Sequence, residues 1–338
     1  MTVAASARLL AVPAPLVFRR HRLAGGARLP LPGGLGGRWF GAAEAALQAP
    51  LLAPEGAVLD AWGGGVGAPS RQHGCVRYAT DGHWLHGCAE IDDAVIGAHA
   101  AAQRAYADLF EVLAAGPCPH LLRLWNYLAG INRQSAGVER YRQFNAGRQQ
   151  AFIDAQRGAF EGAPAACALG TRDGPLRVYF LAGRTPALAL ENPRQVSAYR
   201  YPETYGPRAP TFSRAALADA GGGRSALFIS GTASIVGHAT LHAGDVRRQT
   251  DESLVNVAAV RAVAAARAGV PFPASELVYT VYLRHADDLP VVREAFEHGV
   301  GVDSAAARDA IYVLADICRT DLLVEIEAHG FAAAGSAA

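Results

Sequence analysis

The chain has 338 residues, of which 51% are hydrophobic and 18% charged, a composition typical of a globular protein with one large or two modest domains. A formal net charge of +1, without a basic cluster, excludes a surface suited to nucleic acid or to an anionic membrane. Lysine is absent, which excludes a pyridoxal phosphate Schiff base, a Schiff-base aldolase site and a Walker A loop, and any anionic small molecule must be bound by arginine.

The N-terminal segment contains a short apolar run, residues 9–12, that is interrupted by Pro13 and Pro15. We expect an edge strand and a loop there, and not a secretory signal. No stretch of the sequence reaches the roughly 18 apolar residues that a membrane-spanning helix needs. An odd number of cysteines argues against a disulfide framework and favours a cytoplasmic location. The five cysteines are Cys75, Cys88, Cys118, Cys167 and Cys318.

The sequence of the first half predicts two strands, a helix, a strand, a second helix and two final strands. Periodic apolar positions indicate a long helix that Gly116 and Pro117 end. The expected strands are residues 74–78, 84–90, 121–128, 165–169 and 176–182, and the expected helices are residues 93–115 and 138–158.

The second half predicts the same order of elements, ββαβαββ. Its expected strands are residues 225–230, 235–241, 277–283, 310–315 and 322–328, and its helices run from Asp251 to Gly269 and from about Pro290 to Gly299. A repeated order indicates duplication, so we infer an α/β fold of two tandem units with mixed sheets packed against helices. The units are residues 1–220 and 221–338, joined by the linker 221–223, and a substrate cleft is expected where their sheets meet.

The last predicted strand carries two carboxylates. Because side chains alternate along a strand, Glu325 and Glu327 share one face and the apolar Val324 and Ile326 share the other. Burial in a cleft raises the pKa of a carboxyl, which makes Glu325 the first candidate for a general acid, with Glu327 as its structural partner. The alternative for Glu325 is a structural role, capping a loop or pairing with an arginine. Tyr179 takes the equivalent position in the first half, which assigns acid chemistry to the second unit alone.

Ordered motifs across nearly the whole chain resemble a known family. Four segments in the second half resemble the Rid (YjgF-like) fold: 228–232 (FISGT), 249–256 (QTDESLVN), 280–283 (TVYL) and 323–328 (LVEIEA). Four earlier segments extend the resemblance to the chorismatases: 123–127 (RLWNY), 139–144 (ERYRQF), 205–210 (YGPRAP) and 213–214 (SR). Chorismatases are lyases or hydrolases built from Rid-like units, and they release pyruvate from chorismate.

The resemblance implies a mechanism without a cofactor. The substrate would be chorismate, whose two carboxylates require cationic clamps. Glu325 would protonate the methylene of the enolpyruvyl ether, and collapse of the resulting oxocarbenium ion would free pyruvate. The substrate-binding residues implied by the resemblance are Arg148, Tyr201, Tyr205, Arg208 and Arg214.

Two further positions separate the products within this family. A glycine paired with a cysteine marks the 3-hydroxybenzoate type, and these positions match Gly231 and Cys318. The resemblance therefore implies capture of the ion by the 4-hydroxyl of the substrate itself. Capture by water would give a dihydroxycyclohexadiene carboxylate, and a third subtype also makes 4-hydroxybenzoate. Outside this class the alternative is a Rid-like imine deaminase or binding protein, and a duplicated unit is compatible with a monomer.

Two other motifs give weaker indications of a functional site. Histidines and cysteines gather within residues 73–88 but lack the spacing of a zinc motif, so no metal is expected. These residues are His73, Cys75, His83, His86 and Cys88. The glycine-rich segment 63–67 is followed by Pro69 and polar residues where a phosphate loop needs a helix, so no nucleotide is expected.

Overall fold

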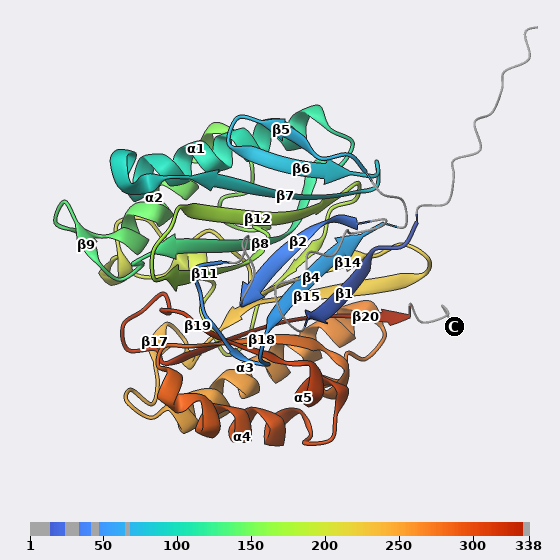
Figure 1. Cartoon of the computed structure of the whole chain (residues 1–338), viewed down its shortest axis with the longest axis vertical. Helices are drawn as coiled ribbons and strands as arrows, with labels where there is room; N and C mark the ends of the chain where they lie inside the picture. Colours follow the sequence, from blue (N-terminus) through green and yellow to red (C-terminus); the bar gives the residue numbers. More distant parts are fainter. Residues whose placement is uncertain (1–13, 24–33, 42–46, 65–67, 334–338) are drawn as a thin grey trace, which may run out of the picture.

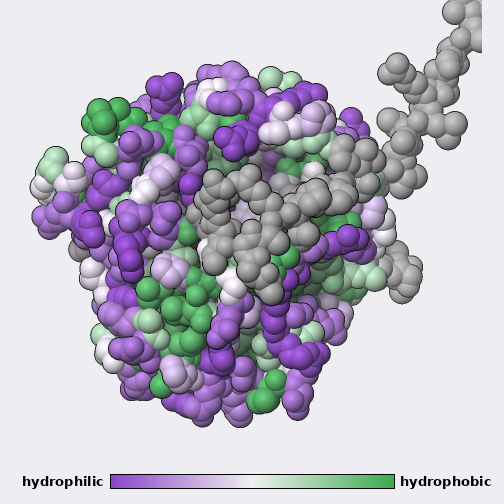
Figure 2. Space-filling view, in the orientation of Figure 1, coloured by the Kyte–Doolittle hydropathy of each residue, from purple (hydrophilic) through white to green (hydrophobic). Residues whose placement is uncertain are grey.

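A computed structural model provides the fold and describes residues 14–23, 34–41, 47–64 and 68–333. The apolar run at residues 9–12 and the end of the glycine-rich segment, residues 65–67, lie outside this part of the chain. Among the described residues, no helix is both long and apolar enough to span a membrane. Hydrophilic side chains cover most of the face shown in Figure 2, with hydrophobic areas between them.

The first large sheet has six strands in the order β11-β8-β12-β7-β6-β5. Helices α1 and α2 cover its outer face, at the top of Figure 1. Strands β8 and β11 are parallel and the other pairs are antiparallel, so the sheet is mixed. The strands are β5 (Arg71–His73), β6 (Val76–Thr80), β7 (Trp84–Ile91), β8 (His120–Ala129), β11 (Ala165–Thr171) and β12 (Leu176–Gly183). The helices are α1 (Asp93–Ala115) and α2 (Arg140–Asp154), and the short strands β9 (Gln134–Ser135) and β10 (Val138–Glu139) precede α2.

The second large sheet has seven strands in the order β13-β14-β15-β20-β18-β19-β3. Helices α3, α4 and α5 lie on its outer side, at the bottom of Figure 1. The strands are β3 (Leu51–Ala53), β13 (Leu188–Leu190), β14 (Ala215–Asp219), β15 (Arg224–Thr232), β18 (Val278–Leu283), β19 (Ile311–Leu314) and β20 (Val324–Ala333). The helices are α3 (Val246–Ala268), α4 (Leu289–Val300) and α5 (Ala305–Asp309), and β16 (Ile235–Val236) pairs with β17 (Ala239–Thr240). Single 3-10 turns occur at Ala198–Arg200, Glu203–Tyr205, Ala274–Glu276 and Ala286–Asp288.

A third, smaller sheet comes from the N-terminal part of the chain. Its strands are β1 (Val17–Leu23), β4 (Ala57–Gly63) and β2 (Gly34–Gly41), all antiparallel and in the order β1-β4-β2. Figure 1 shows this sheet beside the two large ones. Four of its buried side chains belong to the core between the large sheets: Leu35, Phe40, Val58 and Trp62.

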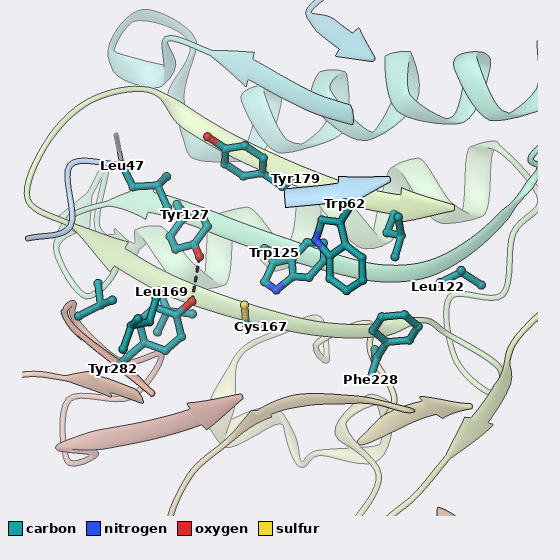
Figure 3. Close-up of a cluster of buried hydrophobic side chains, with 14 of the residues drawn as sticks. Leu47, Trp62, Leu122, Trp125, Tyr127, Cys167, Leu169, Tyr179, Phe228 and Tyr282 are labelled. Carbon is teal, nitrogen blue, oxygen red and sulfur yellow. Dashed lines mark hydrogen bonds between the residues drawn. The ribbon is translucent and has the colours of Figure 1, made fainter. Parts of the chain in front are cut away.

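The inner faces of the two large sheets form the main core. Trp125, Tyr127 and Cys167 from the first sheet meet Phe228 and Tyr282 from the second (Figure 3). The Tyr127 and Tyr282 hydroxyls form a hydrogen bond of 2.9 Å in this core. The sheets are also joined at one edge, where the backbones of Gly170 and Asp316 exchange hydrogen bonds of 2.7 and 3.0 Å. The two large sheets therefore share one buried interior.

The predicted mixed α/β class is confirmed, but three local predictions are wrong. Helix α3 begins at Val246 and not at Asp251, because Asp245 caps it by accepting a 3.0 Å hydrogen bond from the Arg248 amide. Residues 235–241 form two short strands around Gly237, whose φ is +57°, and the hairpin partner of β15 is β14. Residues 221–223 have positive φ throughout and form the turn of that hairpin, and not a linker. The division of the chain into two units at residue 221 stays a prediction. Strands β13 and β14 precede residue 221 in the sequence but extend the second sheet.

Candidate active site

A cavity of about 370 Å³ is lined by residues from Glu139 to Glu325, which come from both halves of the chain. The start of helix α2, with the residue before it, and the irregular segment 201–214 form one side of it. The end of strand β15, the residues after it, segment 318–321 and strand β20 form the other. The cavity therefore lies where both halves of the chain contribute side chains, as the tandem arrangement predicts.

Glu325 lies on β20, a strand paired on both sides with β15 and β18. Its side chain lines the cavity and is only 3% exposed. Burial raises the pKa of the Glu325 carboxyl to about 8, and the neighbouring Glu327 charge adds to the rise while Arg123 and Arg214 oppose it. At neutral pH the carboxyl therefore carries a proton and presents it to the cavity.

Glu327 stands two residues further along the same face and has the opposite ionisation. Its carboxylate accepts hydrogen bonds from Arg38 Nη1 at 2.9 Å, Arg123 Nη2 at 2.6 Å and the Tyr282 hydroxyl at 3.1 Å. Burial alone would raise its pKa, but Arg38 and then Arg123 lower it to about 2. The two carboxyls thus differ in charge at neutral pH, because only Glu327 is paired with guanidinium groups.

Gly231 lies at an irregularity in the pairing of β15 with β20, between Ile229 and Thr232. A Cβ at position 231 would overlap the Glu325 carboxyl oxygen and lie 2.9 Å from the Cys167 Cβ. Bulges of this kind often re-aim side chains beside active sites. The absence of a side chain at position 231 is therefore what leaves room for the acid.

Three arginines line the cavity, and two of them have unsatisfied donors. Arg214 donates through Nη2 to the Val196 carbonyl and to the Tyr201 hydroxyl, both at 2.7 Å, while its buried Nε has no partner among the described residues. Arg319 donates to the His238 carbonyl at 2.8 Å, and its buried Nη2 likewise lacks a partner within the described chain. Both guanidinium groups carry a positive charge beside the cavity, and this charge attracts an anionic ligand.

The third arginine of the cavity, Arg142, comes from the first turn of α2. Its Nη2 donates to the Thr204 carbonyl at 3.2 Å, and its Nε lies 3.3 Å from Glu139. It therefore joins the helix to the segment over the cavity and adds a positive charge at the rim.

Aromatic side chains form the apolar part of the wall. The Tyr201 and Tyr205 rings lie 5.5 Å apart between centroids, and the Arg319 guanidinium lies 3.9 Å from the Tyr205 centroid. Tyr141 and Phe212 line the same space. The wall therefore combines aromatic rings with guanidinium groups.

Cys318 also lines the cavity, at the end of the chain segment that follows β19. Burial raises the pKa of its thiol to about 12, and the Glu325 charge contributes to the rise. The thiol is therefore neutral and not an activated nucleophile.

Comparisons with known proteins agree with this geometry. Residues 60–182 match the family model described as Chorismatase FkbO/Hyg5-like, N-terminal. The chain is 39% identical over 265 residues to a 3-hydroxybenzoate synthase of Streptomyces hygroscopicus, covering 75% of each chain. It is 38% identical over 276 residues to a chorismatase of Streptomyces rapamycinicus, covering 79% of this chain and 80% of the relative. A chorismatase crystal structure superposes at 30% identity with a TM-score of 0.82, over 95% of this chain and 99% of the other. The chain belongs to the chorismatase family.

The cavity of this chorismatase-family protein contains most, but not all, of the residues singled out from the sequence. Those that line it are Tyr201, Tyr205, Arg214, Gly231, Cys318 and Glu325. Arg148 does not line it: the side chain is 1% exposed, lies over the Phe144 ring and donates to Asn145 Oδ1 at 3.0 Å. Arg208 is exposed and donates to Gln149 Oε1 at 3.3 Å, also away from the lining.

Neither Arg319 nor Arg142, both of which line the cavity, was singled out from the sequence. Arg319 directly follows Cys318, a predicted product-determining residue. This position in the sequence could have indicated that Arg319 lies at the site. Of the alternative metal residues, Cys75, His86 and Cys88 line a different cavity beside β2, whereas His73 lies 2.6 Å from Glu111 on α1. No group of three or more potential metal ligands occurs in the part of the chain that the structure describes.

Proposed function

We propose that this chorismatase-family protein converts chorismate to 3-hydroxybenzoate and pyruvate, with Glu325 as the general acid. The observation that carries the proposal is a buried carboxyl, with its pKa raised to about 8, in a cavity that is also lined by three arginines. Chorismate combines two carboxylates with an acid-sensitive enol ether, and this cavity offers partners for each.

Substrate binding is assigned to the arginines and tyrosines of the wall. Arg214 and Arg319 would each bind a carboxylate through the guanidinium charge beside the cavity, and Arg142 would add charge at the rim. Tyr201 and Tyr205 would cover the ring and are fixed by hydrogen bonds, Tyr201 to Arg214 and Tyr205 to the His238 carbonyl at 2.7 Å. The clamp is thus preorganised, which lowers the entropy cost of orienting the substrate.

The reaction then needs one proton from the protein. Glu325 protonates the methylene carbon of the enolpyruvyl group, and positive charge develops at the neighbouring carbon as an oxocarbenium ion. The 4-hydroxyl of the substrate attacks the ring carbon that bears the ether oxygen, the carbon–oxygen bond breaks, and pyruvate leaves. Loss of the 4-hydroxyl proton, followed by ring opening and aromatisation, gives 3-hydroxybenzoate. The Glu325 carboxylate recovers a proton released in these steps, so substrate and products balance without water.

The choice of the intramolecular route rests on Gly231 and Cys318. Both line the cavity beside Glu325, and neither side chain can act as a base or nucleophile at neutral pH. The name of the Streptomyces hygroscopicus relative, 3-hydroxybenzoate synthase, also supports this route. Formation of the diene diol with water, and the mixed 3- and 4-hydroxybenzoate reaction, are the alternatives within the class.

We further propose that the enzyme acts in the cytoplasm on this small molecule alone, without a cofactor, a metal or a macromolecular partner, and as a monomer. Five free cysteines support a reducing compartment. The two units already share a core, which supports activity within one chain.

The test is incubation of the purified protein with chorismate, followed by chromatography and mass spectrometry of the products. The proposal expects 3-hydroxybenzoate and pyruvate in equal amounts, and no turnover with Glu325→Gln, which keeps the shape of the side chain but has no acidic proton. A diene diol as product would identify the hydrolase, and a mixture of hydroxybenzoates the bifunctional type. No pyruvate would exclude a chorismatase and direct the assay to imine substrates.

A further inference from the structure

A second buried carboxyl, Glu327, lies beside Glu325 on β20. We propose that Glu327 is a positioning residue that keeps the catalytic proton on Glu325, and that Arg38 of the N-terminal sheet, with Arg123, holds Glu327 as the charged member of the pair. The inference rests on the proposed function for its role in turnover, but its electrostatic content can be measured without the substrate.

The carboxyls of Glu325 and Glu327 differ in their hydrogen-bond partners. They lie two residues apart on one face of β20, about 7 Å along the strand, a distance at which buried charges interact strongly. Glu327 accepts hydrogen bonds from two guanidinium groups, on β2 and β8, and both of these side chains are at most 2% exposed. Neither guanidinium bonds to Glu325, which faces the cavity. The negative charge therefore belongs to Glu327, and repulsion from it favours the neutral form of Glu325.

Arg38 is shared between two carboxylates. Its Nη1 bonds to Glu327 at 2.9 Å and to the Tyr127 hydroxyl at 2.9 Å, and its Nη2 lies 3.3 Å from Asp60. Asp60 is in turn held by Arg20, at 2.7 Å through Nε and 2.8 Å through Nη2. The N-terminal sheet thus reaches the back of the active site through a chain of buried ion pairs.

Other charged and titratable groups face the pair, and none of them is changed in the two Glu327 variants below. Glu139, Arg142, Arg319 and Asp321 line the cavity that Glu325 faces, and further groups surround the two carboxyls. They are Arg123 and Tyr127 from β8, Cys167 from β11, Tyr282 from β18, Arg38 from β2, Asp60 from β4, Arg214 from segment 201–214, Tyr141 from α2, Cys318 after β19 and His329 on β20 itself. The cysteine thiols and tyrosine hydroxyls have raised pKa values, mainly through burial, and His329 has its pKa lowered by burial, so these groups are uncharged near pH 7. The only negative charge beside Glu325 on its own strand is that of Glu327.

The experiment compares pH profiles of kcat/KM for three variants. Glu327→Gln removes the negative charge and leaves Arg123 facing Glu325, so the basic limb of the profile should move to lower pH by about 1 to 3 units, while activity at lower pH remains. Glu327→Asp restores the charge and should return the limb toward that of the wild type. A purely structural role would lower activity at all pH values without moving the limb.

Asp60→Asn supplies the matched control. Asp60 is also a buried carboxylate bound to Arg38, but it lies on β4 and is not a neighbour of Glu325. Its loss should reduce stability without shifting the basic limb. An unmoved limb in Glu327→Gln, or equal shifts in Glu327→Gln and Asp60→Asn, would overturn the inference.

A second readout separates this inference from the proposed function. The carboxyl band of protonated Glu325 can be titrated by infrared difference spectroscopy against Glu325→Gln, in the wild type and in Glu327→Gln. The pH at the midpoint of the Glu325 titration should be lower in Glu327→Gln than in the wild type, whether or not chorismate is turned over. If Glu327→Gln does not fold, Glu327→Asp and Arg38→Lys, which retain both charges, should keep the wild-type midpoint, and Arg38→Met should move protonation onto Glu327. Unchanged protonation of Glu327 in a folded Arg38→Met protein would refute the part assigned to Arg38.

Discussion

Replacement of Glu325 by glutamine should change the pH dependence of stability in a defined direction. An ordinary glutamate ionises near 4.5, whereas burial raises the pKa of Glu325 in the folded protein to about 8. Between these values the folded state holds a proton that the unfolded state has lost. Stability contributed by this group is therefore complete below about pH 4.5 and is lost as the pH rises to about 8.

The size of the effect follows from the shift. A rise from 4.5 to about 8, at about 1.4 kcal/mol for each unit, corresponds to roughly 5 kcal/mol of unfolding free energy lost across that range. Glutamine has no proton to lose, so the Glu325→Gln protein should gain about this much relative to the wild type between pH 4.5 and 8.5. The pKa of Glu327 is lowered to about 2, so this group stays charged across the range from pH 4.5 to 8.5. Its contribution to the unfolding free energy is the same in both proteins.

Urea unfolding followed by tryptophan fluorescence measures this difference. The wild type and Glu325→Gln should differ little at pH 4.5 and most at pH 8.5, with equal slopes against denaturant. Stability curves that run parallel from pH 4.5 to 8.5 would refute the raised pKa and, with it, the assignment of the proton.

Three further predictions concern the cavity. Gly231→Ala places a Cβ against the Glu325 carboxyl. This change should lower kcat at least about tenfold and shift the remaining product toward the diene diol. An unchanged rate together with an unchanged product ratio, measured by mass spectrometry, would contradict this. Arg214→Gln and Arg319→Gln should each weaken binding by about 1.5 to 3 kcal/mol, seen as a raised KM, whereas Arg208→Gln, outside the lining, should leave KM unchanged; the reverse pattern would place the carboxylates elsewhere. Cys318→Ala should retain turnover because the thiol is neutral, so an inactive but folded variant would indicate that the thiol takes part in the chemistry.

Local patterns in the sequence predicted the residues that a strand or a motif positions. Alternation along residues 322–328 places Glu325 and Glu327 on one face, and the structure keeps this arrangement because β20 is paired on both sides. The same pairing buries Val324 and Ile326 in the core beneath α3 and α4. Repetition of the element order predicted two sheets, each with its helices, and a cavity where the units meet.

Contacts between distant segments could not be predicted in this way. Arg38 and Glu327 are 289 positions apart and meet only because the N-terminal sheet packs against the core of both units. Arg148 carries a charge that the sequence suggests for substrate binding, yet helix α2 turns it inward over Phe144. The direction of a helical side chain depends on packing, which the spacing of charges alone does not specify.

The central claim, that Glu325 holds a proton in the folded protein at neutral pH, can be measured directly. Infrared difference spectra between the wild type and Glu325→Gln at pH 7 should contain the carbonyl stretching band of a protonated carboxyl, and this band should disappear as the pH is raised past about 8. A carboxylate band already present at pH 6, with no protonated carboxyl assignable to Glu325, would contradict the account.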